Sequence, residues 1–141
     1  MTDIRSTLKI AVAAALAACA LGAQAQTATI NYNRCDNTYD GWGAHLWKDG
    51  GIPLAGIEWQ KPMPISGKND FGVFWTVKTD DFTKGRVNYI IHKGDSKEQG
   101  GRDMSFDANA TKEIWVNSGD RKIYTSLEDA KKAREAKPCT N

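Results

Sequence analysis

Short apolar and aromatic runs alternate with turn-forming segments along most of this 141-residue chain. Period-two alternation, or enrichment in β-branched and aromatic residues, makes each run typical of a β-strand. The runs lie at 27–33, 42–47, 56–61, 71–78, 86–92, 113–117 and 122–125. About seven strands separated by turns every 8–12 residues predict an all-β sandwich. We expect the polar stretch 93–103 to be a long loop.

One helix is predicted after the strands. Ser126 can cap its first turn, and Asp129 follows three residues later, as in a capping box. An amphipathic stretch then reaches about Ala136, and Pro138 ends it. We interpret this helix as structural, with its charged side chains in solvent.

The first 25 residues have the pattern of a secretory signal peptide. Arg5 and Lys9 give a positive start, and the apolar run 10–21 is too short to span a bilayer. Ala23-Gln24-Ala25 has the form of a cleavage site. We therefore predict a signal peptide at 1–25 and a secreted or periplasmic protein.

A second processing route stays open at the same end of the chain. Leu16-Ala17-Ala18-Cys19 has the form of a lipobox, which would place a lipid on Cys19. The protein would then be lipid-anchored in the cell envelope. Neither route would leave a membrane span in the mature chain.

Two cysteines remain after residue 25, Cys35 and Cys139. In an exported domain they predict one disulfide, which would tie the first strand to the C-terminus. We therefore expect a sandwich module at 26–125 and a helical tail at 126–141 held by this disulfide.

Composition and motifs argue against several function classes. Lys plus Arg number 19 and Asp plus Glu 17, so the net charge of +2 does not predict a nucleic-acid partner. The chain has no G-x-S-x-G, H-E-x-x-H or P-loop motif. Its two histidines and scattered acids lack metal-ligand spacing, so we expect no metal or cofactor. We predict no catalytic residues, with a small secreted glycosidase as a weaker alternative.

The second predicted strand carries the most informative aromatic residues. Because side chains alternate along a strand, Trp42 and Leu46 face the core, while Gly43, His45 and Trp47 face the other way. Since Gly43 has no side chain, we expect it to leave space and both rings to lie uncovered. Such a pair suits a sugar, because the electron-rich ring face attracts polarised C–H groups. Trp42 is retained only as a secondary candidate contact.

Sugar hydroxyls also need hydrogen-bonding partners. Lys97 and Asp103, in the loop after the strand 86–92, offer a flexible cation and a carboxylate acceptor. Lys93 and Asp95 are the nearby alternatives. The remaining aromatic and imidazole groups are interpreted as structural: Trp59, Trp75 and Trp115 in the core, and His92 as a hydrogen-bonding residue.

Several stretches resemble a known family. They are Thr29–Arg34, Tyr39–Trp47, Ile90–Lys97, Ser105–Asp107, Glu113–Val116 and Ile123–Tyr124. The run Y-D-G-W-G-x-H-L-W followed by I-I-H-K-G-D-x-K strongly resembles the pullulanase-associated starch-binding module, carbohydrate-binding module family 41. The resemblance covers about residues 27–125.

The resemblance implies an immunoglobulin-like antiparallel β-sandwich that binds α-glucans such as starch, glycogen and pullulan. Family members usually present two aromatic residues on one strand, with a lysine and an aspartate bonding the hydroxyls. These positions correspond here to His45, Trp47, Lys97 and Asp103. Some members have tryptophan at the position of His45, and the loop 98–102 is a residue longer than usual, which leaves Asp95 as a competitor of Asp103.

Family modules normally lie within a large amylolytic enzyme, and the resemblance does not explain the C-terminal helix. We therefore predict a secreted, non-catalytic module that binds α-glucan polysaccharides or maltooligosaccharides. A separate amylolytic enzyme is a candidate partner. The alternative is an envelope protein-interaction module that uses the same sandwich.

Overall fold

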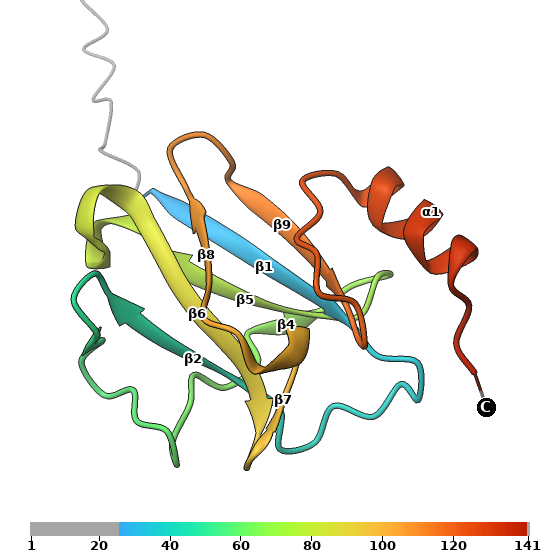
Figure 1. Cartoon of the computed structure of the whole chain (residues 1–141). Helices are drawn as coiled ribbons and strands as arrows, with labels where there is room; N and C mark the ends of the chain where they lie inside the picture. Colours follow the sequence, from blue (N-terminus) through green and yellow to red (C-terminus); the bar gives the residue numbers. More distant parts are fainter. Residues whose placement is uncertain (1–25, 141) are drawn as a thin grey trace, which may run out of the picture.

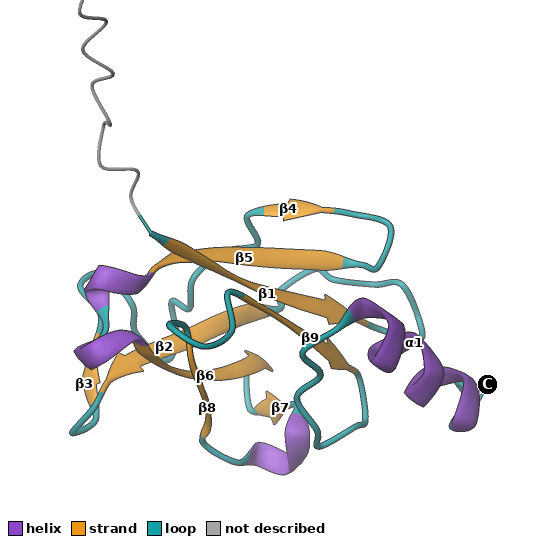
Figure 2. Ribbon diagram, turned by 90° about the horizontal axis from the view of Figure 1, so that it is seen from above, coloured by secondary structure: helices purple, strands orange, loops and turns teal. Residues whose placement is uncertain are grey.

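Alternating apolar side chains bring two β-sheets face to face (Figures 1 and 2). The computed structural model describes residues 26–140; the predicted signal peptide and Cys19 lie outside them. The first sheet has the order β4-β5-β1-β9, and the second has the order β3-β2-β6-β7, with β8 also paired to β6. All neighbours are antiparallel except β1 and β9, which are parallel. The all-β, immunoglobulin-like sandwich expected from the sequence is confirmed.

The bounds of the elements are as follows. The first sheet contains β1 (Thr27–Asn33), β4 (Gly67–Lys68), β5 (Val73–Lys78) and β9 (Glu113–Asn117). The second contains β2 (Gly43–Lys48), β3 (Ile52–Pro53), β6 (Arg86–Lys93), β7 (Ser96–Lys97) and β8 (Met104–Asp107). Short 3₁₀ helices span Thr79–Asp81, Thr83–Gly85 and Gln99–Gly101, and α1 spans Leu127–Ala136.

The core is formed by every second residue of the long strands. Ile30 and Tyr32 of β1 and Leu46 of β2 are buried, together with their equivalents on β5, β6 and β9. Trp75 is fully buried, and its indole N–H donates to the carbonyl oxygen of Met63 at 3.0 Å. A buried side chain of this size contributes roughly 1.5–3 kcal/mol through its apolar area, and the hydrogen bond offsets the cost of burying its polar edge. Trp75 is therefore a core residue, as predicted.

The predicted helix is present with its predicted cap. The hydroxyl of Ser126 accepts the backbone N–H of Asp129 at 3.1 Å. The helix packs against β9 through the buried Ala130, whose carbonyl accepts the side-chain amide of Asn117 at 2.9 Å. No helix within residues 26–140 is long and apolar enough to cross a membrane.

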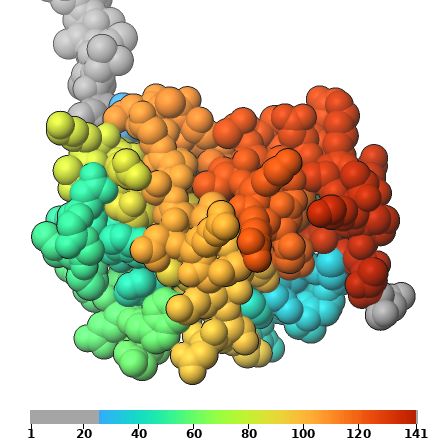
Figure 3. All heavy atoms as spheres, in the orientation of Figure 1, coloured from blue at the N-terminus to red at the C-terminus, as the bar shows by residue number. Residues whose placement is uncertain are grey.

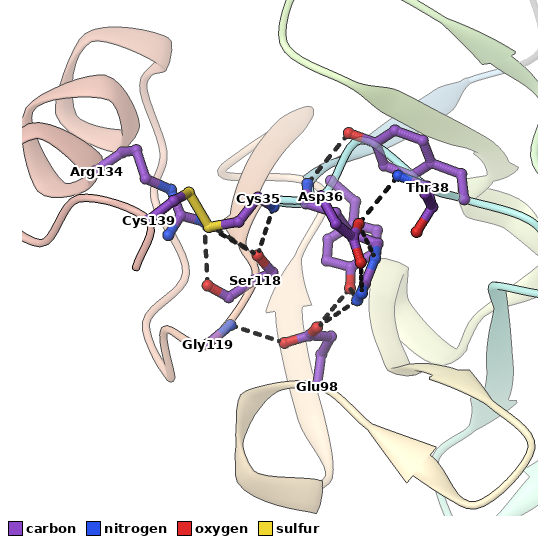
Figure 4. A network of polar contacts seen from close by, with 11 residues as sticks. Cys35, Asp36, Thr38, Glu98, Ser118, Gly119, Arg134 and Cys139 are labelled. Atoms are coloured by element: carbon purple, nitrogen blue, oxygen red, sulfur yellow. Dashed lines mark hydrogen bonds and ion pairs between the residues drawn. A yellow bond between two sulfur atoms is a disulfide. The ribbon is translucent and has the colours of Figure 1, made fainter. Parts of the chain in front are cut away.

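Cys35 and Cys139 form the predicted disulfide, with their Cα atoms 5.5 Å apart and 104 residues between them in sequence (Figure 4). Cys35 follows β1, and Cys139 follows the helix. Beside the bond, Ser118 accepts the backbone N–H of Cys35 at 3.2 Å, and Arg134 donates to the Ser118 carbonyl at 3.0 Å. The C-terminal tail is therefore tied to the end of β1.

A polar network links the two sheets close to this disulfide (Figure 4). Glu98, just after β7, accepts the Tyr32 hydroxyl and the backbone N–H of Gly119, the latter at 3.0 Å. Arg34 approaches Glu98 at 3.4 Å and pairs with Asp36 at 2.8 Å. Burial, and then the hydrogen bond to Glu98, raise the pKa of Tyr32, which keeps its hydroxyl protonated as the donor.

Three sequence expectations about secondary structure are wrong. The short strand expected within 56–61 is absent, because Gly56, with a φ of 77°, and Pro62 leave room only for a tight turn closed by the bridge between Glu58 and Lys61. The stretch 93–103 is not an irregular loop, since it contains β7 and a 3₁₀ helix. The expected strand 122–125 is reduced to a single bridge between Tyr124 and Trp115.

Trp115 is also misassigned by the sequence. It pairs across the sheet with Asn31 and lies on the outer face of the first sheet, where it is half-buried. The buried residues of β9 are its neighbours Ile114 and Val116. An indole in the middle of an apolar run is typical of a core residue, but the register of β9 places the side chain of Trp115 on the outer face.

Replacing Cys35 and Cys139 together by serine should lower the free energy of unfolding by about 4–5 kcal/mol, because the disulfide closes a loop of 104 residues in the unfolded chain. Denaturation by guanidinium chloride, followed by tryptophan fluorescence, measures the loss. Reduction of the wild-type protein should give the same shift. An unchanged denaturation midpoint in both experiments would contradict this role.

Candidate functional site

The outer face of β2 presents two aromatic rings. Ala44 and Leu46 of this strand are buried, and the residues between and after them, His45 and Trp47, lie half-exposed on the opposite face. The ring centroids of His45 and Trp47 are 5.6 Å apart, and their planes differ by 31°. The side-chain alternation expected for this strand is therefore present, and both rings lie on one face of the second sheet.

The space beside Gly43 is not open as expected. A Cβ built on Gly43 would lie 2.5 Å from the Cγ of Pro62, so this proline already closes over the glycine. The backbones of Ala44 and Met63 exchange two hydrogen bonds, of 3.1 and 2.8 Å, which pin the loop 54–64 to β2. The absent side chain at position 43 thus lets a neighbouring loop approach the sheet.

This loop brings a further indole onto the same face. The ring of Trp59 stacks on the imidazole of His92, with centroids 3.7 Å apart and planes 7° apart. It also meets His45 edge-on, at 5.4 Å and 72°. Trp59 is half-buried on the surface and does not belong to the core, so the sequence interpretation of this residue is wrong. We call Trp47, His45, Trp59 and His92 the ring cluster.

His92 is the buried member of the ring cluster, with 1% of its surface exposed. Its Nδ1 atom lies 2.9 Å from the carbonyl oxygen of Gly94. Because a carbonyl oxygen only accepts, Nδ1 carries a proton and donates it to this oxygen. The expected hydrogen-bonding role of His92 is therefore present, and the stacked Trp59 is what covers the ring.

Lys97 lies beside the ring cluster. It pairs with His92 across β6 and β7, which places both residues on one face of the sheet. The Lys97 ammonium lies 5.1 Å from the ring centroid of Trp59, within the range of a cation–π contact. Figure 3 shows the light green atoms near residue 60 beside the yellow atoms of the β6–β7 turn.

Asp103 lies one residue ahead of β8 and is exposed. β8 pairs Met104 with Tyr89 of β6, so continuing this register sets Asp103 opposite Ile90. Ile90 in turn pairs with His45 of β2. Lys97 and Asp103 thus lie along the edge of β6 opposite to β2, on the sheet that carries the ring cluster.

The secondary candidates lie elsewhere. Trp42 is packed against the core: its ring centroid is 5.6 Å from that of Tyr32, and the guanidinium of Arg34 covers it at 4.2 Å. Lys93 runs along Gly41, where a Cβ would be 3.1 Å from its Cε. Asp95 is exposed in the turn between β6 and β7. Neither Trp42 nor Lys93 joins the ring cluster.

The environment of His45 favours its uncharged form. Burial, and then the charge of a protonated His92, lower the pKa of His45 below its ordinary value of 6.5. The centroids of the two imidazoles are 6.3 Å apart, and Lys97 adds a further positive charge near Trp59. The His45 ring is therefore uncharged at pH 7, and the Lys97 ammonium lies at one side of the ring cluster.

The lowered pKa of His45 predicts a loss of stability in mild acid. The unfolded chain takes up this proton near pH 6.5 and the folded chain only at lower pH, so the free energy of unfolding should fall as pH drops below 6.5. Urea denaturation between pH 7.5 and 5 measures the slope. His45→Phe keeps a ring and should show a shallower slope; an identical slope in the variant would contradict the assignment.

Comparisons with known proteins agree with this architecture. The α-amylase of Streptomyces lividans is 35% identical over 71 residues, which are 50% of this chain and 7% of that enzyme. A solved structure of family 41 carbohydrate-binding modules from streptococcal virulence factors superposes with a TM-score of 0.58 at 22% identity, covering 73% of this chain and 48% of that one. The pullulanase of Klebsiella pneumoniae complexed with maltotriose gives a TM-score of 0.61 at 21% identity, covering 81% of this chain and 12% of that one.

This chain thus spans only a small part of both enzymes. The two structural similarities support the same fold. The family assignment rests instead on a family model that matches most of the chain. The bacterial pullanase-associated domain matches residues 26–125, which include both sheets and the ring cluster. The chain therefore belongs to the bacterial pullanase-associated domain family.

Proposed function

We propose that the protein is a non-catalytic module that binds α-glucan chains on the ring-bearing face of the second sheet. The observation that carries this proposal is the pair His45 and Trp47, two rings 5.6 Å apart and tilted by 31° on the outer face of one strand. Each ring offers a flat apolar surface to one sugar ring of the chain. Starch, glycogen, pullulan and maltooligosaccharides are the ligands in this class.

The size of the ring pair agrees with weak to moderate binding. Covering on the order of 100 Å² of apolar surface at each ring gives roughly 2.5 kcal/mol per sugar before ordering costs. After subtraction of those costs, two stacked rings correspond to a Kd between about micromolar and millimolar. The lowered pKa of His45 supports the same role, because the neutral imidazole is the less hydrated form and is easier to cover with a sugar.

The hydroxyl groups of the sugar would be held by Lys97 and Asp103. Lys97 is a donor close to the ring cluster, 5.1 Å from the ring of Trp59, and Asp103 is a carboxylate acceptor on the same edge of β6. Asp95 is the alternative acceptor. The structural relatives support an α-glucan ligand, since one is described by its α-glucan recognition and another is complexed with maltotriose.

The cellular context of the proposal comes from the sequence. The predicted signal peptide at 1–25 makes the module secreted or periplasmic, and a lipid on Cys19 would instead anchor it in the envelope. The family match and the similarity to an α-amylase support an amylolytic enzyme as partner. The module would then concentrate glucan for that enzyme.

Trp47→Ala should abolish the retardation of the protein by glycogen in native affinity electrophoresis, because it removes the larger ring of the pair. Trp115→Ala is the matched control, since it removes a half-buried indole from the outer face of the other sheet. Undiminished retardation of Trp47→Ala would contradict the site. Release of reducing sugar from glycogen by the wild-type protein would contradict the non-catalytic assignment.

Lys97→Ala should weaken maltoheptaose binding by about 5- to 30-fold, the value of a hydrogen bond of roughly 1–2 kcal/mol that involves a charged group. Titration calorimetry measures the change in Kd. Lys93→Ala is the control, because Lys93 packs along Gly41 away from the ring cluster. If Lys97→Ala binds maltoheptaose as tightly as the wild type and Lys93→Ala binds it more weakly, the sugar-binding lysine is Lys93 and the assignment of Lys97 is wrong.

A further inference from the structure

Trp59 lies between the two halves of the proposed glucan site. Its ring is 5.4 Å from that of His45 on one side and 5.1 Å from the Lys97 ammonium on another. A glucan chain that stacks on Trp47 and His45 and reaches Lys97 must therefore pass Trp59. Resting on the function proposed above, we propose that Trp59 is a third sugar-contacting ring and that the buried His92 is the positioning residue that holds it.

The planes of the three rings suit a chain that bends. From Trp47 to His45 the planes turn by 31°, and from His45 to Trp59 by 72°. A flat chain would need rings in one plane, whereas in an α-1,4-linked glucan the faces of successive sugars turn. The Trp59 ring is thus steeply inclined to the His45 ring beside it, where the next sugar of a curved chain would contact it.

The loop that carries Trp59 is held on both sides of the indole. Glu58 and Lys61 exchange two backbone hydrogen bonds, of 3.1 and 3.0 Å, around the tip that contains Trp59. Further along, Met63 is bonded to Ala44 of β2. The indole is therefore placed before a ligand arrives, and less conformational entropy is lost on binding.

His92 supports the indole from below. Its ring is parallel to Trp59 within 7° at 3.7 Å, and its Nδ1–H is fixed by the carbonyl of Gly94. Its Nε2 atom is buried and has no hydrogen-bond partner among residues 26–140. Burying a nitrogen without a hydrogen-bond partner costs stability, so His92 is not explained by its contribution to the fold. Its contribution is instead a flat, fixed ring on which the Trp59 indole stacks.

The test uses chain length as its readout. Maltose is long enough for His45 and Trp47 only, whereas maltotetraose would also reach Trp59. In the full mature protein, Trp59→Ala should weaken maltotetraose binding about tenfold, the value of one stacked ring, and leave maltose binding nearly unchanged. Trp115→Ala is the matched control and should change neither affinity.

The role of His92 is tested by ring replacement. His92→Phe keeps a flat ring under Trp59 and should retain most of the maltotetraose affinity, whereas His92→Ala should lose it about as far as Trp59→Ala does. The double variant His92→Ala with Trp59→Ala should lose no more than either alone. An additive loss in the double variant, or equal losses in His92→Phe and His92→Ala, would overturn the positioning role.

A spectroscopic readout covers the case in which an alanine variant does not fold. In ¹H–¹⁵N spectra the indole N–H signal of Trp59 is assigned by its disappearance in Trp59→Phe. Maltotetraose should shift this signal and that of Trp47, and maltose should shift mainly that of Trp47. If maltotetraose shifts the indole N–H signal of Trp47 and leaves that of Trp59 unchanged, Trp59 does not contact the sugar. The glucan site on His45 and Trp47 is then still supported. If neither sugar binds the wild-type protein, the proposed function itself fails, and this inference with it.

Discussion

The antiparallel pairing of β2 with β6 is the interaction on which the rest of the structure depends. Ala44 is opposite Ile91 and Leu46 is opposite Tyr89, and these residues close the core from one side. On the other side of the same two strands, His45 is opposite Ile90. A slip of one residue would turn the rings inward and the core residues into solvent. The hydrophobic core therefore fixes the register, and the register places the rings.

The short strand β7, which carries Lys97, is held in place by residues of the first sheet. Glu98 follows Lys97 directly and accepts hydrogen bonds from Tyr32 of β1 and from Gly119, which follows β9. The C-terminal tail strengthens the same region, because its disulfide joins the residue next to Arg34 and Arg134 holds Ser118. The family resemblance does not explain the C-terminal helix. In this structure the helix and its disulfide hold the ends of β1 and β9, and these are the two places that donate hydrogen bonds to Glu98.

Sequence reasoning was most successful where one local rule decides the outcome. Side-chain alternation places Leu46 inward and Trp47 outward, and the Ser126 cap and the single cysteine pair follow from residue type and from the predicted export. It failed where the outcome depends on contacts distant in sequence. Strands of two residues, such as β3, β4 and β7, exist only through their partners and leave almost no periodic signal.

Two tryptophans, Trp59 and Trp75, illustrate the same limit. Trp59 and Trp75 both lie in segments predicted as strands and are both expected in the core, yet one covers the sheet from outside and the other fills the core. The signal that separates them is indirect: Gly43 and Pro62 together allow the loop to cross the sheet, as their close contact shows. A sequence reading that paired this glycine with the proline-bounded loop could have placed Trp59 on the outer face.

The geometry of the ring cluster also gives a physical reason for tolerating a small ring at position 45. An imidazole offers less stacking area than an indole, and its charged form would be harder to cover with an apolar sugar face. Here burial and the nearby His92 keep His45 neutral, and the edge-on indole of Trp59 adds apolar surface directly beside it. Under the proposed function, a rigid strand supplies two rings and a pinned loop supplies the third. The third ring then offers its area to the next sugar of the chain, at a site whose shape is set before the glucan binds.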